Sequence, residues 1–88
     1  MLRLTRTTRS PEGAVLKAEG QIVAEWVSLL EHECLELAAR DHRVVLDLGE
    51  VSYLDSRAVR LIRRLAAGPL SIVNCSPLVE ELLAEDVP

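Results

Sequence analysis

The first apolar positions of the chain alternate with polar ones, which is the period of a strand. Two such stretches, Leu2 to Arg9 and Ala14 to Glu19, flank the tetrapeptide Ser10-Pro11-Glu12-Gly13. Serine, proline and glycine occupy its first, second and fourth places, as a type I turn favours. We therefore expect an antiparallel hairpin, with Gly20 either ending or kinking its second strand.

The period changes to that of a helix between Ala24 and Arg40. Apolar side chains fall within an arc of about 120° at 100° per residue. They are Trp26, Val27, Leu30, Cys34, Leu37 and Ala38. The opposite arc carries Glu25, Ser28, His32 and Glu36, with Glu31 and Glu33 near its edges. The pattern predicts a helix that packs by one face, and a solvated face is the simplest interpretation of its acidic side.

An apolar run from Val44 to Leu48 is rich in β-branched residues and predicts a central strand. We expect Glu50 to Leu54 to form a loop. A second amphipathic pattern then runs from Arg57 to Ala67, and both Asp55 and Ser56 before it are residues that favour helix N-caps. We assign the capping role to Ser56, whose hydroxyl would bond a free backbone N–H.

The second helical pattern stops at Gly68-Pro69, and one more strand and one more helix follow. The strand is predicted from Leu70 to Asn74, and Ser76-Pro77 supplies a cap and a first residue for a helix from Leu78 to Glu85. The predicted order is ββαβαβα. Helices between strands imply right-handed crossovers and parallel neighbours. We expect an α/β fold, one small domain over residues 1–88 with a mixed, mostly parallel four-stranded sheet.

Composition supports a single folded domain and narrows the range of ligands. The chain has 88 residues, of which 49% are hydrophobic and 27% charged. It is too short for two cores and too apolar to be disordered. The net charge of −4 argues against duplex nucleic acid, and the only aromatic residues, Trp26 and Tyr53, provide no base-stacking platform. We expect no nucleic-acid partner.

The sequence also indicates where in the cell the protein is located and whether it binds a metal. Met1 to Ser10 has no apolar signal region, and the uncharged stretch from 65 to 79 is interrupted by glycine and proline. We expect a cytoplasmic protein without direct membrane insertion. Cys34 and Cys75 lack the spacing of a zinc site, which predicts free thiols, no metal and no cofactor.

Three arginines share one side of the second predicted helix. Arg60 and Arg64 lie within about 60° of Arg57 on a helical wheel, away from the apolar arc. Such a face suits an acidic partner or an anionic headgroup, because guanidinium groups bind carboxylate and phosphate in a bidentate way. Ion pairing with the acidic first helix is an equally good interpretation, and both stay open.

Nothing around Ser56 indicates catalysis. Its flanks read Leu-Asp-Ser-Arg-Ala rather than Gly-x-Ser-x-Gly, and no histidine has a spacing that supports a triad. The glycines are scattered and form no phosphate-binding loop. We predict that the protein is not an enzyme.

Two segments carry a resemblance to a known family. The first is V-V-L-D-L-G-E-V-S-Y-L-D-S, from Val44 to Ser56, and the second is L-S-I-V-N-C-S-P, from Leu70 to Pro77. Together with the junction from Ala18 to Ile22, they resemble the STAS domain, named for sulfate transporters and anti-sigma-factor antagonists. The likeness covers residues 14 to 85. It implies helices mainly on one face of the sheet and a role in binding a protein partner.

Stand-alone bacterial members of this family bind an anti-sigma kinase, which phosphorylates a hydroxyl in an Asp-Ser-Ser/Thr-Gly segment and so releases the antagonist. This partner switching regulates transcription. Asp55 and Ser56 match the segment, but Arg57 stands at the usual acceptor position and Ala58 at that of the glycine. We expect a divergent member whose interaction is constitutive or differently regulated, unless Ser56 takes over as the phosphorylated residue.

The resemblance leads to two hypotheses for function. In the first, a signalling module similar to an anti-sigma-factor antagonist binds an anti-sigma kinase-like protein. Its contact residues would be Asp55, Ser56, Arg57, Arg60 and Arg64, with the loop from Glu50 to Asp55. In the second, the chain is a small cytosolic STAS subunit of an ABC-type membrane transporter, and the arginines meet the transport ATPase. A weak homodimer is compatible with either.

Overall fold

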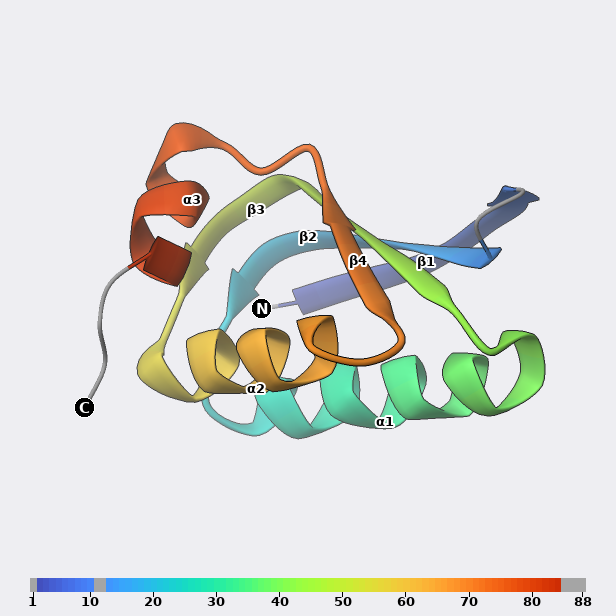
Figure 1. Cartoon of the computed structure of the whole chain (residues 1–88). Coiled ribbons are helices and arrows are strands. Elements are labelled where there is room, and N and C mark those ends of the chain that lie inside the picture. The colour runs from blue at the N-terminus through green and yellow to red at the C-terminus, as the bar shows by residue number, and fades with distance from the viewer. Residues whose placement is uncertain (1, 11–12, 85–88) are drawn as a thin grey trace.

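The computed structural model describes residues 2–10 and 13–84, which form a four-stranded sheet and three helices (Figure 1). The elements are β1 (Leu2–Ser10), β2 (Gly13–Ile22), α1 (Glu25–Asp41), β3 (Val44–Leu54), α2 (Ser56–Ala66), β4 (Leu70–Val73) and α3 (Pro77–Ala84). Their order is the one predicted from the sequence. The predicted turn residues Pro11 and Glu12 lie outside the described residues.

The sheet has the strand order β1-β2-β3-β4. Strands β1 and β2 are antiparallel, whereas β2, β3 and β4 are parallel, with Leu46 of β3 between Leu16 of β2 and Ile72 of β4. Helices α1 and α2 connect the parallel strands, as crossovers require. The α/β class and the mixed, mostly parallel sheet are confirmed.

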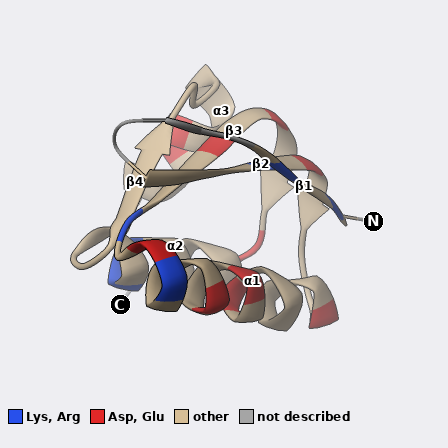
Figure 2. Cartoon of the chain, turned by 90° about the vertical axis from the view of Figure 1, so that its right-hand side faces the viewer, with Lys and Arg blue, Asp and Glu red and all other residues tan. Residues whose placement is uncertain are grey.

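Helices α1 and α2 cover one face of the sheet, and α3 lies on the other side against β3 (Figures 1 and 2). Aliphatic side chains fill the layer between the sheet and the first two helices. Among them Leu16, Leu30, Leu46 and Ile62 are completely inaccessible to solvent. Val79 of α3 is also fully buried. The closely packed layer holds the beginning of α2 in a fixed place at the carboxyl end of β3.

Strand β3 is longer than the sequence predicts. The segment from Glu50 to Leu54, expected to form a loop, continues the strand and pairs with β2. Buried residues in this half are Leu48, Val51 and Leu54, at every third position. The register between β2 and β3 shifts here, so the period of two that marks a strand in a sequence is lost. The loop prediction is wrong for this reason.

Gly20 kinks β2 rather than ending it. The strand continues to Ile22, and Gly20 takes a φ of 98°, a region that favours glycine. The β2–β3 register shifts again directly after Gly20. The extension carries Ile22 to the beginning of α2, where its carbonyl accepts a hydrogen bond from the N–H of Asp55 at 3.2 Å.

Among residues 2–10 and 13–84, no helix combines the length and the apolar character that crossing a bilayer requires. The same residues contain no group of three or more His, Cys, Asp or Glu side chains that would hold a metal ion.

The two cysteines are free thiols in different surroundings. Cys34 is 2% exposed, and burial raises its pKa to about 12, whereas Cys75 is only half-buried. Because the accessible thiolate is the reactive form, we expect iodoacetamide at pH 8 to modify Cys75 in the native protein at least about tenfold faster than Cys34. Peptide mass spectrometry after timed alkylation measures both rates, with urea-unfolded protein as the control. Equal native rates would contradict the burial of Cys34.

Candidate functional site

Asp55 joins the beginnings of two helices. Its Oδ1 accepts a hydrogen bond from the N–H of Ala58 at 2.8 Å and so caps α2. Its Oδ2 accepts one from the N–H of Ala24, also at 2.8 Å, immediately before α1. With the backbone bond to Ile22, this residue connects the end of β2 to both helices. The turn into α2 therefore has a fixed geometry.

Ser56 is not the cap that the sequence predicts. It is the first residue of α2 and is exposed, and its hydroxyl forms no hydrogen bond with any described residue. Asp55 caps instead, because its two carboxylate oxygens bind two N–H groups and its charge suits the helix N-terminus. The Ser56 hydroxyl is thereby left open to solvent beside the turn.

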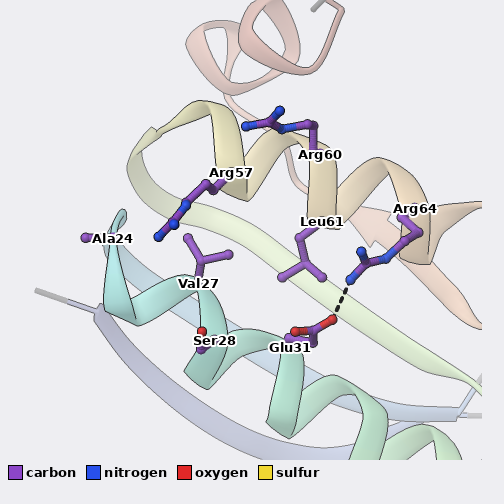
Figure 3. A pocket seen from close by; sticks show the side chains of 8 residues that line it. All are labelled: Ala24, Val27, Ser28, Glu31, Arg57, Arg60, Leu61 and Arg64. Carbon is purple, nitrogen blue, oxygen red and sulfur yellow. Dashed lines mark hydrogen bonds and ion pairs between the residues drawn. The ribbon is translucent and has the colours of Figure 1, made fainter.

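Two arginines of α2 are bound within the protein. Arg64 forms an ion pair with Glu31 of α1 (Figure 3). Arg63 donates a hydrogen bond from Nε to the carbonyl oxygen of Leu83 at 2.8 Å, and so attaches α3 to α2. Of the two interpretations of the arginine face, ion pairing with the acidic first helix therefore holds for Arg64.

In contrast to Arg63 and Arg64, the other two arginines of α2, Arg57 and Arg60, are not bound to the described part of the protein. Both are exposed, and neither forms an ion pair or hydrogen bond with residues 2–10 and 13–84. Arg57 lies in the first turn of α2, where a cation opposes the helix dipole at a cost of a few tenths of a kcal/mol. A residue that opposes the local preference and has no ion pair with residues 2–10 and 13–84 is typical of a functional site.

A shallow groove of about 370 Å³ lies between α1 and α2. Val27 of α1 and Leu61 of α2 point toward each other across it, and the pair of Glu31 and Arg64 bridges the two helices (Figure 3). Arg57 extends toward the first turn of α1 (Figure 3). Arg60 also lines the groove but stands on the outer side of α2, with its side chain directed away from α1 (Figure 3).

The groove is basic although the protein is acidic. Its lining contains three arginines and one glutamate, a net charge of +2, whereas the whole chain carries −4. Its free guanidinium groups are donors only, so they can bind carboxylate or phosphate oxygens but cannot supply a base or a nucleophile. The arrangement is suited to binding an anionic group.

The sequence leaves open an ion pair between the arginine face and the acidic first helix, and the pair of Arg64 with Glu31 is of that kind. The pattern does not show that Glu31 is the partner or that a groove lined by Val27 lies between the two helices, because a helical wheel treats each helix alone. The signal that could have revealed Glu31 is its place at the edge of the acidic arc, next to the apolar face that packs. Residues at such an edge meet the neighbouring helix.

The rest of the acidic face of α1 is partly paired with β1. Arg6 donates to Glu33 at 2.6 Å and to Glu36 at 3.2 Å, and these bonds raise the pKa of Arg6. Acidic positions recur along the helix (Figure 2). The basic groove is therefore bordered by a surface of opposite charge.

Sequence comparison assigns the chain to a family. Residues 5–85 match the family model described as Mlab, STAS domain. The chain belongs to the STAS domain family. No curated protein matches it significantly in sequence.

Solved structures share the fold at low sequence identity. The anti-sigma factor antagonist SpoIIAA in its unphosphorylated form matches with a TM-score of 0.67 and 16% identity, over 91% of this chain and 80% of that one. An uncharacterised DUF3478 protein from Shewanella loihica with a SpoIIAA-like fold gives 0.58 and 17%, over 92% and 72%. Mglu gives 0.61 and 23% over 81% of this chain, but only 19% of Mglu is covered. The fold is therefore SpoIIAA-like.

Proposed function

We propose that the protein is a cytosolic, non-enzymatic binding module whose protein partner docks on the turn into α2 and on the arginines behind it. The observation that carries this proposal is the exposure of Arg57 and Arg60, which have no partner among the described residues. Arginine is enriched among the residues that dominate binding at protein interfaces. Membership in the STAS domain family and the SpoIIAA-like fold support a module similar to an anti-sigma-factor antagonist.

The proposed contact surface comprises Asp55, Ser56, Arg57, Arg60 and Arg64. Asp55 acts by holding the turn in place, and Ser56 and the arginines face the partner. An anti-sigma kinase-like protein is the partner class that the family resemblance favours. Because Arg57 cannot be phosphorylated as a hydroxyl can, we propose that binding is not released by modification at that position, which leaves Ser56 as the candidate for phosphorylation in this turn.

A second candidate function is that of a small cytosolic STAS subunit of an ABC-type transporter, with the transport ATPase as partner. Arg57 favours this alternative, because a permanent cation at the usual acceptor position suits a constitutive contact. The two candidates use the same surface and differ in the protein that binds to it.

Reversing both free charges, Arg57→Glu with Arg60→Glu, should weaken partner binding at least about a hundredfold, since interface arginines of this kind often contribute 2 kcal/mol or more each. Tagged wild-type and variant proteins are purified from the native host in detergent, and captured proteins are quantified by mass spectrometry. An anti-sigma kinase-like protein or a transport ATPase, lost from the variant, identifies which candidate is right.

The matched control reverses Arg3 and Arg40, two exposed arginines outside α2, and so gives the same net charge. Circular dichroism checks that both double variants are folded. If every captured protein binds the two variants equally, the proposed function is wrong.

A further inference from the structure

We infer that the groove between α1 and α2 receives a carboxylate-bearing segment of the partner protein, and that Glu31 competes with this segment for Arg64. The inference rests on the proposed function and specifies the chemistry of the partner. It assigns a binding role to α1, in addition to the turn into α2.

The shape and lining of the groove fit such a segment. A volume of about 370 Å³ is at the lower end of the range of about 300–1,000 Å³ that ligand sites occupy. Half-buried Val27 offers an apolar contact for an aliphatic side chain, and Leu61, which is only 4% exposed, closes the bottom of the groove (Figure 3). The fork of Arg57 is free to take a carboxylate in a bidentate way, and Arg60 adds a second free cation at the edge.

The surrounding charge favours a short acidic segment over a broad anionic surface. The acidic face of α1 borders the groove, and the chain carries −4 overall, so a membrane or a nucleic-acid backbone spread over this region would meet repulsion. A narrow segment can place its carboxylates between the helices without covering that face. The occupant is therefore a peptide stretch that combines acidic and aliphatic residues.

Glu31 already presents a carboxylate to Arg64, as the partner would. The side chains are 39% exposed for Glu31 and 67% exposed for Arg64, and exposed ion pairs of this kind contribute little stability. A partner carboxylate can therefore replace Glu31 without disturbing the fold. Until it does, Glu31 reduces the positive charge of the groove and lowers its affinity for acidic segments that fit poorly.

The test uses the full chain and two synthetic peptides, Ac-GELEELG-NH2 and its lysine counterpart Ac-GKLKKLG-NH2. Binding is followed by chemical-shift changes in ¹⁵N–¹H spectra. The acidic peptide should shift amides of α1 and α2 around the groove, and the lysine peptide should not. Arg57→Ala should weaken binding of the acidic peptide at least about tenfold.

The decisive comparison is between Glu31→Gln and Glu36→Gln, which change the net charge equally. Glu36 pairs with Arg6 and lies outside the groove lining, so its variant controls for long-range electrostatics. Glu31→Gln should bind the acidic peptide about three- to tenfold more tightly than the wild type, and Glu36→Gln should stay within about twofold. Equal affinities of the two variants would overturn the role of Glu31.

The outcomes separate this inference from the proposed function. If the acidic peptide leaves the groove amides unshifted while the captured partner still depends on Arg57 and Arg60, the groove inference fails and the proposed function stands. Groove shifts caused instead by anionic phosphatidylglycerol vesicles, and not by the peptide, would also overturn the inference. If no captured protein depends on the two arginines, the proposed function itself fails.

Discussion

Replacing Asp55 with alanine is expected to lower the free energy of unfolding by about 2.5–4 kcal/mol. The change removes the cap of α2, worth about 1 kcal/mol, and a charge-assisted hydrogen bond to the N–H of Ala24, worth about 1.5–3 kcal/mol. Ala24 has a φ of 52°, a conformation that alanine rarely adopts, so the bond from Asp55 holds a strained residue. Urea unfolding followed by circular dichroism measures the loss.

Two further variants show whether the effect belongs to both hydrogen bonds. Ser56→Ala removes an exposed hydroxyl without a partner among the described residues, so it should change the stability by less than about 0.5 kcal/mol. Asp55→Asn keeps one acceptor oxygen for the cap but loses the charge and the second acceptor, so it should lie between alanine and wild type. A variant Ser56→Ala that is as unstable as Asp55→Ala would show that the cap is misassigned.

The position of this cap illustrates what the sequence predicts and what it does not. Both Asp55 and Ser56 are residues that cap helices, and local preference cannot choose between them. The choice depends on how far β3 runs, because the strand extends to Leu54 and places Asp55 at the junction. The error of one residue at the helix start is a consequence of the missed strand extension.

The regular parts of the fold are predictable because their burial follows a single period. In β2 the buried residues Ala14, Leu16 and Ala18 alternate, and in α2 the apolar side packs as the helical wheel indicates. Gly68 and Pro69 mark the helix end for local steric reasons. In contrast, the outer half of β3 depends on a register shift against β2, which is a property of two strands and not of one sequence segment.

The candidate site also has one part that a single sequence segment predicts and one part that depends on tertiary packing. The grouping of Arg57, Arg60 and Arg64 on one side of α2 follows from helix geometry alone. Which of them is free depends on the packing of α1 against α2, since Glu31 and Arg64 are 33 positions apart and meet only in the folded chain. The sequence therefore identified the arginine face, and the tertiary structure reduced its open part to two residues.

Replacing Leu46 with alanine is expected to lower the free energy of unfolding by about 3–5 kcal/mol, the upper part of the range for a buried leucine. Leu46 is fully inaccessible to solvent and lies in the inner strand β3 between Leu16 and Ile72, where paired strands on both sides limit collapse around a cavity. A chain of this length is stable by only about 4–13 kcal/mol, so the variant should unfold at a much lower urea concentration.

The matched control is Leu35→Ala, because Leu35 is 49% exposed on α1 and its truncation should change the stability by less than about 0.5 kcal/mol. Leu46→Val leaves a smaller cavity and should lose only about 1 kcal/mol, which keeps the test informative if the alanine variant does not fold. Equal urea midpoints for Leu46→Ala and Leu35→Ala would mean that the apolar layer between the sheet and helices α1 and α2 is not the main source of the stability of the fold. The fixed turn at Asp55 would then lack its support, because the packing of that layer positions both helices that the carboxylate joins.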